Sequence, residues 1–188
     1  MDNNGLALII SGPSGVGKGT VIKAFLENNS DFSLSTSYTT RKPRKNEING
    51  KDYFFVTKSE FLEKIKNKAF FEWAKVHGNY YGTDKDTIKA QLAQGQKIIF
   101  EIDVQGAMQL ISNIKKIYIL SIFLMAPNLY TLKQRLNDRG SESEKNMFIR
   151  LENAKKEIEL SKHFDFSVVN DRIMDTINQI TGIIQRRK

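Results

Sequence analysis

The feature that most constrains this chain is a glycine-rich segment at residues 12–18, which reads Gly-Pro-Ser-Gly-Val-Gly-Lys and matches the phosphate-binding pattern G-x-x-x-x-G-K. An apolar run without alternation, residues 6–10, precedes it, as expected for a strand buried on both faces of a parallel sheet. Residues 20–29 follow, with apolar side chains at helical spacing. Glycines let backbone N–H groups wrap around phosphate oxygens, and the start of a helix adds partial positive charge. The order strand, loop and helix therefore predicts a phosphate-binding loop within an α/β fold.

The rest of the chain repeats this alternation of strands and helices. Further strands of the buried type are predicted at residues 97–102, 117–124 and 166–169. Helices are predicted at residues 85–94, 105–112, 129–138, 144–162 and 173–186. Strands that alternate with helices indicate a parallel sheet that is flanked by helices and connected by right-handed crossovers.

Two segments interrupt the alternation. Residues 33–83 contain short β-like pieces at 34–40, 53–56, 70–76 and 80–82, around one helix that begins with the capping box Thr57-Lys58-Ser59-Glu60. Residues 139–143 form a polar, glycine-containing connection between two helices, which suits a mobile lid. We therefore predict a single domain over residues 1–188. Its parts are a core (5–32, 84–134 and 163–188), a small mixed-β insertion (33–83) and a helical lid (about 135–162).

Composition narrows the class of protein. Hydrophobic residues make up 40% of the chain and charged residues 27%, close to the averages for soluble globular proteins. The longest apolar run, residues 117–126, is about half of the roughly 20 residues that a membrane-spanning helix needs, so we expect no membrane association. The first residues lack the basic region and cleavage site of a signal peptide, and the chain has no cysteine, which favours the cytoplasm. Oligomeric state has no signature in the sequence.

The net charge of +8 leaves three interpretations open: a nucleic-acid surface, an anionic substrate, or lysine-rich solvated faces. The lysines are mostly scattered at helical spacing beside glutamates, which favours solvated faces for them. The arginines instead gather in three groups, and two of these groups lie beside motifs that need positive charge. We therefore expect an anionic small-molecule substrate and no nucleic acid.

The phosphate-binding loop departs from the usual pattern at one position. Lys18 is placed to reach the β- and γ-phosphates of ATP, but the Ser or Thr that normally follows is Gly19, and the hydroxyl comes one residue later, at Thr20. We therefore expect Mg²⁺ to be held mainly by phosphates and waters, with carboxylates outside its direct ligands. The predicted ATP-binding residues in this loop are Gly12, Pro13, Ser14, Gly15, Val16, Gly17, Lys18, Gly19 and Thr20.

The insertion contains residue types that suit a phosphomonoester. Such a group carries nearly two negative charges, so it calls for forked guanidinium groups and phenolic hydroxyls. Arg41, Arg44, Tyr53 and Tyr81 supply them. From the residues alone, the two arginines also fit a solvated basic loop and the two tyrosines fit packing aromatics.

Glu72 lies between Phe71 and Trp73 in a β-like run. If this run alternates, the two aromatic side chains share one face and Glu72 points to the other, which is either solvent or a pocket. Spacing alone leaves both possibilities open.

Several of these segments together closely resemble the guanylate kinase family, with matching spacing over essentially the whole chain. They are residues 37–44, 49–55, 71–74, 78–83, 101–106 and 169–171. The resemblance implies Mg²⁺-dependent transfer of the γ-phosphate of ATP to GMP or dGMP, giving ADP and GDP, within purine nucleotide metabolism. It also implies that Glu72 is the carboxylate that accepts from the guanine base, with Ser37 and Thr83 as hydroxyl partners and Asp103 nearby.

Glu101 and Asp103 lie at the predicted carboxyl end of a strand, where open α/β sheets bind ligands. Two positions apart in a strand, they are expected to share one face. The family commonly has Asp where this chain has Glu101, so this carboxylate reaches about one methylene further. We assign Glu101 to water-mediated support of Mg²⁺ and Asp103 to the acceptor nucleotide; an end-of-strand charge is the alternative for either.

The second arginine group belongs to the predicted lid. Arg135 and Arg139 are four residues apart and share a helix face, and Arg150 begins the next helix. Their segment is similar to the family's lid, whose arginines stabilise charge on the transferring phosphoryl group. With Lys18 and Arg41 they form the predicted catalytic set; a solvated basic face is the alternative. Asn170 resembles the family residue near the adenine ring.

Three other functions compete with a GMP kinase. Guanylate kinase-like domains also serve as peptide-binding scaffolds, but those typically have an impaired phosphate loop, whereas this chain keeps Lys18. A kinase of another phosphate ester would need Glu72 and Ser37 to serve a different acceptor. A nucleic-acid binder would need a stripe of basic and aromatic residues outside the nucleotide pocket, which the sequence lacks.

Overall fold

The computed structural model describes residues 5–76, 78–114, 119–137 and 144–186. The predicted strand start at residues 117–118, the predicted loop at 139–143 and the lid residue Arg139 lie outside these ranges. Within them, no helix is long and apolar enough to cross a membrane.

The main sheet has five parallel strands in the order β2-β7-β1-β8-β9. They are β1 (Leu6–Ser11), β2 (Phe32–Leu34), β7 (Lys97–Glu101), β8 (Ile119–Met125) and β9 (Phe166–Val169). The central strand β1 pairs with β7 and β8, so that Leu8 lies between Ile99 and Leu120. Each crossover between parallel strands carries the chain over a face of the sheet, which is why both faces are covered.

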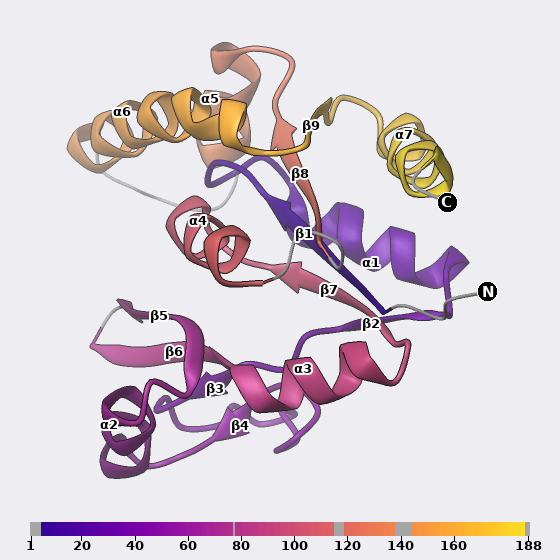
Figure 1. Cartoon of the computed structure of the whole chain (residues 1–188). Helices are drawn as coiled ribbons and strands as arrows, with labels where there is room; N and C mark the ends of the chain where they lie inside the picture. Colours follow the sequence, from indigo (N-terminus) through magenta and orange to yellow (C-terminus); the bar gives the residue numbers. More distant parts are fainter. Residues whose placement is uncertain (1–4, 77, 115–118, 138–143, 187–188) are drawn as a thin grey trace.

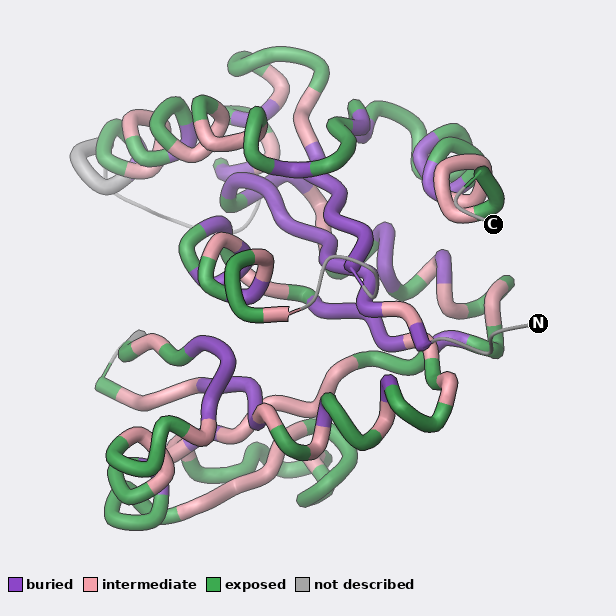
Figure 2. The backbone as a smooth tube through the Cα atoms, viewed as in Figure 1, coloured by how far each residue is buried: buried purple, intermediate pink, exposed green. Residues whose placement is uncertain are grey.

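Helices cover the two faces of this sheet (Figure 1). They are α1 (Lys18–Asn28), α3 (Lys85–Ala93), α4 (Val104–Asn113), α5 (Leu129–Asn137), α6 (Glu144–Glu159) and α7 (Ile173–Arg186). Alternate residues of β1 serve the two faces. Leu8 and Ile10 pack in one core cluster with residues of α1 and α7, and Ala7 and Ile9 in a second cluster with residues of α3 and α4. The sheet is accordingly the most continuously buried part of the chain (Figure 2).

A second, mixed sheet of four strands lies beside the main one, in the order β4-β3-β6-β5. Its strands are β3 (Tyr38–Thr39), β4 (Phe54–Phe55), β5 (Phe70–Val76) and β6 (Asn79–Asp84), with α2 (Lys58–Lys66) packed on them. The capping box is confirmed, because the Thr57 side chain accepts from the Glu60 amide and the Glu60 carboxylate accepts from the Thr57 amide. The predicted fold class, a parallel α/β sheet with a mixed-β insertion, is confirmed.

The structure corrects two predicted elements. The piece predicted at 34–40 is divided between the two sheets: Leu34 ends β2 of the parallel sheet, and only Tyr38–Thr39 joins the small one. Phe32 explains this division between the sheets. The centres of the Phe32 and Phe25 rings are 5.3 Å apart in an edge-on arrangement, which holds the start of the segment against the core. The helix predicted to end at 162 ends at Glu159, where a 3₁₀ turn (Leu160–His163) begins. The boundaries of core, insertion and lid stay a prediction.

Candidate functional site

The glycine-rich loop joins β1 to α1 at the carboxyl edge of the parallel sheet. Gly12 and Gly17 have positive φ angles of 147° and 95°, a region that disfavours other residues. Space adds a second requirement: a Cβ on Gly12 would lie 2.3 Å from the Leu124 carbonyl oxygen, and one on Gly17 would lie 2.8 Å from Asn170 Nδ2. The glycines therefore let the loop turn tightly while it touches β8 and the segment after β9.

Lys18 is the first residue of α1, and its side chain folds back across the loop. Its Nζ donates to the carbonyl oxygens of Gly12 at 2.6 Å and Pro13 at 3.3 Å. Among the described residues, no side chain caps the start of α1, and the N-cap position is Gly17 in a left-handed conformation. Backbone N–H groups at a helix start carry partial positive charge and bind anions readily. The loop therefore has the form expected of a phosphate site, and phosphate binding itself stays a prediction.

A cavity of about 320 Å³ lies on one side of the loop. It is lined by Gly15, Gly17, Thr20, Arg135, Asn170, Asp171 and Ile173. Of these, the sequence analysis missed Asp171 and Ile173. Asp171 is adjacent to Asn170 in the segment 169–171 that carries part of the family resemblance, so a sequence pattern could have identified it. No sequence pattern marks Ile173.

Asn170 lines this cavity, but its side chain is already engaged. Its Nδ2 donates to the Val16 carbonyl at 2.8 Å, and its Oδ1 accepts from the Thr176 hydroxyl at 3.1 Å. Its backbone carbonyl accepts from Arg135 at 2.9 Å. Only 5% of Asn170 is exposed. The residue therefore ties the phosphate-binding loop to α7 and α5, a role that the sequence did not predict.

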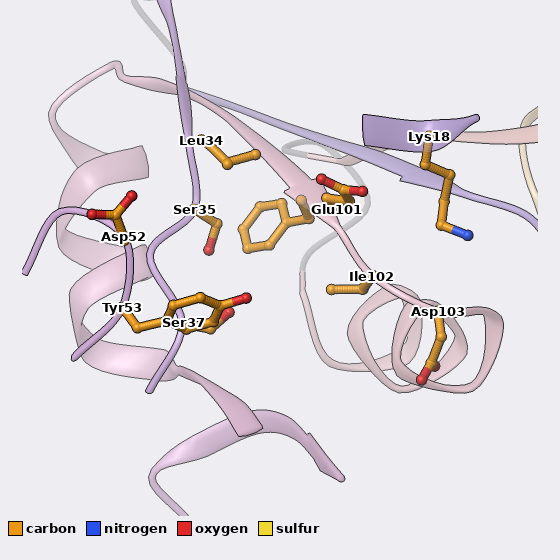
Figure 3. Close-up of a pocket in the computed structure, with 10 residues that line it drawn as sticks. Lys18, Leu34, Ser35, Ser37, Asp52, Tyr53, Glu101, Ile102 and Asp103 are labelled. Atoms are coloured by element: carbon orange, nitrogen blue, oxygen red, sulfur yellow. The ribbon is translucent and has the colours of Figure 1, made fainter. Parts of the chain in front are cut away.

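A second cavity, of about 340 Å³, lies between the loop and the small sheet (Figure 3). Its lining brings together five residues predicted from the sequence: Lys18, Ser37, Tyr53, Glu101 and Asp103. They come from α1, the segment before β3, the segment before β4, the end of β7 and the start of α4. Missed lining residues are Leu34, Ser35, Asp52, Phe100 and Ile102.

Glu72 and Thr83 form a buried polar pair across β5 and β6. The Thr83 hydroxyl donates to Glu72 Oε1 at 2.6 Å, with Thr83 fully buried and Glu72 8% exposed. Burial raises the pKa of the Glu72 carboxyl, the hydrogen bond from Thr83 lowers it, and the charge of Asp103 raises it further. Both carboxylates lie at the start of α4, since a Cβ on Gly106 would be 3.3 Å from Glu72 Oε2 and 3.4 Å from Asp103 Oδ1. Of the two directions left open by its spacing, Glu72 thus points inward and not to solvent, although neither cavity has it among its lining residues; its contact with a ligand stays a prediction.

The alternation expected along this run is wrong. Phe71 is 5% exposed whereas Trp73 is 41% exposed, so the two rings do not share an environment. The cause is a register shift between Phe70 and Glu72 in the pairing of β5 with β6. Such a bulge places consecutive residues on the same side and is common beside functional sites.

Arg41 is held by its own loop. Its Nη1 and Nη2 donate to the two carboxylate oxygens of Glu47 at 2.9 and 2.8 Å, and the backbone N–H of Arg44 donates to the same carboxylate at 2.7 Å. The hydrogen bond from Arg41 is the main reason that the pKa of Glu47 falls to about 2. The pKa of Arg41 is raised, most strongly by Glu47 and also by a hydrogen bond with Tyr81. Sequence analysis missed Glu47, because one glutamate in a polar loop carries no pattern.

The other residues predicted for the acceptor phosphate surround Arg41. Its guanidinium lies 5.4 Å from the centre of the Tyr53 ring, and the rings of Tyr53 and Tyr81 are 6.1 Å apart at a steep angle. Burial raises the pKa of Tyr53. Arg44 is exposed in the same loop. Arg41, Tyr53 and Tyr81 therefore form one cluster, with Arg44 at its edge.

Glu101 and Asp103 do not share a strand face, contrary to expectation. The strand β7 ends at Glu101, and Asp103 is the N-cap of α4, where its Oδ1 accepts from the Gly106 amide at 2.8 Å. In Figure 3 the two side chains point in different directions. Glu101 instead meets the loop: a Cβ on Gly19 would lie 3.2 Å from its Oε1. Its carboxylate thus lies beside the position where most such loops have a Ser or Thr side chain.

The two described lid arginines both contact the glycine-rich loop. Arg135 of α5 donates to the carbonyls of Asn170 at 2.9 Å and Val16 at 3.4 Å, and Arg150 of α6 donates to the Ser14 hydroxyl at 2.7 Å. These neutral acceptors come from the loop and its surroundings. Arg135 and Arg150 therefore both lie at the glycine-rich loop, and their catalytic role stays a prediction.

Comparisons with known proteins identify the family. The family model described as guanylate kinase matches residues 4–187. A guanylate kinase of Clostridium tetani is 46% identical over 98% of this chain and 87% of its own length, and one of Rickettsia bellii is 44% identical over 99% and 97%. A crystal structure of guanylate kinase from Anaplasma phagocytophilum superposes with a TM-score of 0.75 at 31% identity, covering 99% of this chain and 87% of that one. By its fold, its phosphate-binding loop and these matches, the chain belongs to the guanylate kinase family.

Proposed function

We propose that this protein transfers the γ-phosphate of ATP to GMP, with dGMP as an alternative acceptor, and releases ADP and GDP. The observation that carries the proposal is the buried pair of Glu72 and Thr83, whose carboxylate lies at the start of α4 beside Asp103. A phosphate loop alone serves many kinds of nucleotide enzyme. The buried carboxylate narrows the acceptor to a base that offers two adjacent donors.

Guanine matches that carboxylate chemically. Its N1–H and N2 amino group donate side by side, so one carboxylate accepts both. In the proposed complex Glu72 accepts these two hydrogen bonds while the Thr83 hydroxyl, already bonded to its Oε1, fixes its orientation. Ser37 and Asp103 are proposed to complete the base site. AMP would present one amino donor and the N1 acceptor to this buried carboxylate, and a mismatch of buried polar groups of this kind gives strong discrimination.

The acceptor phosphate is proposed to lie on the cluster of Arg41, Arg44, Tyr53 and Tyr81. Two hydrogens of the Arg41 guanidinium point to Glu47, so phosphate binding either uses the remaining N–H groups or replaces this carboxylate. The two tyrosine hydroxyls and the exposed Arg44 supply further donors. The acceptor phosphate is ionised at neutral pH, so no strong general base is needed.

ATP is proposed to bind with its phosphates in the loop and its base in the cavity beside Asn170. Lys18 must exchange the carbonyl oxygens of Gly12 and Pro13 for phosphate oxygens, which carry full negative charge and accept more strongly. Asn170 acts by holding Val16 in place. Arg135, Arg139 and Arg150 would stabilise negative charge on the transferring group, and catalysis of this reaction is mainly positioning and electrostatics.

Magnesium fits the residues present, although in a different manner from a standard loop. Among the described residues, no three carboxylate, imidazole or thiol groups converge to hold an ion. The Glu101 carboxylate lies beside Gly19, the position that usually supplies the hydroxyl ligand, and carboxylate oxygens suit Mg²⁺ through one of its waters. We propose that Mg²⁺ enters with ATP, that Glu101 holds its water shell, and that bound Mg²⁺ neutralises charge on the β- and γ-phosphates.

The experiment is an ADP-release assay with ATP and Mg²⁺, in which GMP, dGMP, AMP, UMP and dTMP are offered separately. GMP and dGMP should support turnover far above the other three. Equal rates with GMP and AMP would refute the base site, and no turnover with any acceptor would refute the kinase. The division into core, insertion and lid is proposed to allow closure over both nucleotides. The cytoplasmic location and the absence of nucleic-acid binding stay predictions.

A further inference from the structure

The loop between β3 and β4 carries two partly buried side chains among exposed ones. Residues 42–46 and 48–50 are exposed, whereas the side chains of Arg41 and Glu47 are only 16% and 18% exposed. Glu47 Oε1 accepts from Arg41 Nη2 at 2.8 Å, and Oε2 accepts from Arg41 Nη1 at 2.9 Å. Oε2 also accepts from the backbone N–H of Arg44 at 2.7 Å. One carboxylate therefore holds both arginines that are expected to bind the acceptor phosphate, Arg41 by its side chain and Arg44 by its backbone.

These contacts leave one edge of the Arg41 guanidinium for another acceptor. A guanidinium carries five N–H donors in a fixed plane. Both hydrogens of Nη1 are used, one by Glu47 and one by the Lys42 carbonyl at 2.8 Å, and Nη2 gives one hydrogen to Glu47. The Nε–H and the second Nη2–H remain, and these two donors lie parallel on the same edge of the group. Of the other described residues, only Tyr81 is a hydrogen-bond partner of this guanidinium, and its hydroxyl is neutral.

Two aromatic rings further restrict the Arg41 guanidinium. Its Cζ lies 5.4 Å from the centre of the Tyr53 ring and 5.7 Å from the centre of the Phe55 ring. Contact with aromatic faces is favourable for a guanidinium and limits the tilt of its plane. Tyr53 also lines the cavity of about 340 Å³ (Figure 3). The guanidinium is thus fixed beside a residue of the cavity wall, with two parallel donors that match two oxygens of a phosphate group.

We propose that Glu47 is a positioning residue for the acceptor phosphate, which holds Arg41 by Nη1 and Nη2 so that the phosphate binds to Nε–H and the second Nη2–H. Glu47 stays in place when GMP binds. Its carboxylate is ionised at neutral pH, since the hydrogen bond from Arg41 lowers its pKa to about 2. The pair therefore offers the phosphate two directed hydrogen bonds and little net charge. The inference rests on the proposed kinase function, and it names the donors of Arg41 that the phosphate uses.

The substitution Glu47→Gln disturbs Arg41 while it keeps the contact to Arg44. Oε2 accepts from both Arg41 Nη1 and the Arg44 N–H, so the amide oxygen of Gln is favoured at that place. Its NH₂ group would then face Arg41 Nη2, donor against donor, and turn the guanidinium. Glu47→Asp keeps the charge with a shorter reach. The matched control is Glu63→Gln, because Glu63 is an exposed carboxylate on α2 of the same insertion.

For Glu47→Gln we expect kcat/KM for GMP to fall roughly 10- to 100-fold, the cost of misplacing a group that binds the acceptor, while the KM for ATP changes less than about twofold. The Kd for GMP, measured by calorimetry, should rise. Glu47→Asp should recover part of the loss. In an Arg41→Ala background, Glu47→Gln should cost less than about threefold, because Glu47 acts through Arg41. Glu63→Gln should match the native protein in each measurement.

Side-chain NMR tests the contact without turnover. A two-pronged ion pair slows rotation of the guanidinium, so the Nη1 and Nη2 groups of Arg41 should give separate signals in the free native protein and merged signals in Glu47→Gln. When GMP is added to the native protein, the Arg41 Nε–H signal should shift. The ¹³C signal of the Glu47 carboxylate should stay where it is, because its partners do not change.

Three results would overturn the proposal. One is a kcat/KM for GMP in Glu47→Gln within about twofold of the Glu63→Gln control, whether or not the melting temperature falls. The second is tighter GMP binding by Glu47→Gln, which would mean that Glu47 only competes with the phosphate. The third is a Glu47 carboxylate signal that shifts on GMP binding, which would mean that GMP displaces it. A native protein that does not phosphorylate GMP would refute the proposed function instead, and the Kd for GMP would then replace kcat/KM in judging Glu47.

Discussion

The substitution Glu72→Gln tests the base site most directly. The Thr83 hydroxyl donates to Glu72 Oε1 at 2.6 Å, so the Gln side chain should keep its carbonyl oxygen on Thr83 and place its NH₂ group where Oε2 was. That position lies 3.3 Å from the Cβ that Gly106 lacks, at the start of α4. The NH₂ would then face the two N–H donors of guanine instead of accepting from them.

The magnitude follows from these contacts. A hydrogen bond to a charged group contributes about 1.5–3 kcal/mol. The substitution removes at least one of the two hydrogen bonds from guanine and places a donor, the Gln NH₂, against the second N–H. A loss of about 3 kcal/mol corresponds to a fall in kcat/KM for GMP of roughly 100- to 200-fold. The kcat/KM for AMP should not fall, because the Gln amide can donate to adenine N1 and accept from the adenine amino group. The GMP/AMP preference should therefore fall by about 100-fold or more, while the KM for ATP stays near the native value.

The assay is ADP release with GMP and AMP as separate acceptors, for the native protein, Glu72→Gln and the control Glu63→Gln, whose carboxylate is exposed on α2. A GMP/AMP preference that survives in Glu72→Gln would refute the base site.

The pH dependence of stability supplies a second check. Burial raises the pKa of Glu72, so its contribution to stability is complete below its unfolded pKa and is lost as pH rises through the folded pKa. Glu72→Gln should therefore be no less stable than the native protein at neutral pH. Its unfolding free energy should also depend less on pH between the unfolded pKa of Glu72 and its raised folded pKa.

Three further substitutions test the other parts of the site. Lys18→Ala should abolish turnover with little change in melting temperature, and ADP release measures it; a rate within about tenfold of native would contradict the role of Lys18. Glu101→Gln should raise the Mg²⁺ concentration needed for half-maximal rate, read from a Mg²⁺ titration at fixed ATP, whereas an unchanged titration would remove Glu101 from the metal site. Asn170→Ala breaks the tie to Val16 and should lower stability by about 1–3 kcal/mol in urea unfolding and raise the KM for ATP. A stability loss without any effect on ATP would limit Asn170 to the fold.

Much of the core could be predicted because burial leaves a periodic trace in the sequence. The continuous apolar run of residues 6–10 predicts a strand covered on both faces, and Ala7 to Ile10 are fully buried in two different clusters. The helix at Ile173–Arg186 matches its predicted bounds for the same reason. The strands of the small sheet were harder to predict. Two-residue strands such as Tyr38–Thr39 are too short to show a period, and the bulge before Glu72 reverses the alternation.

The site divides along a similar line. Lys18 and the glycines could be proposed because a fixed spacing encodes the loop, and Glu72 because its segment resembles a family pattern. The residues that hold these side chains in place could not be proposed from the sequence. Glu47 lies six residues from Arg41 in a polar loop, and Val16 and Asn170 are 154 residues apart, so no local pattern links either pair. Asp103 shows the same limit, since its N-cap role depends on where β7 ends.

Four described cations that are expected to bind phosphate, Lys18, Arg41, Arg135 and Arg150, already have acceptors within the protein, and these acceptors differ in a way that bears on the two substrates. Lys18 and Arg135 donate to neutral backbone carbonyls. A phosphate oxygen is the stronger acceptor, so exchanging a carbonyl for it is favourable. Arg41 instead donates to the carboxylate of Glu47, itself a charged acceptor, and the pair presents little net charge to the acceptor phosphate. In the proposed complex, phosphate capture on the GMP side should therefore depend more on the exposed Arg44 and on the tyrosine hydroxyls than on Arg41 alone. Electrostatic attraction should accordingly favour ATP in the loop over the acceptor phosphate in the insertion, and selection of GMP should rest mainly on its base.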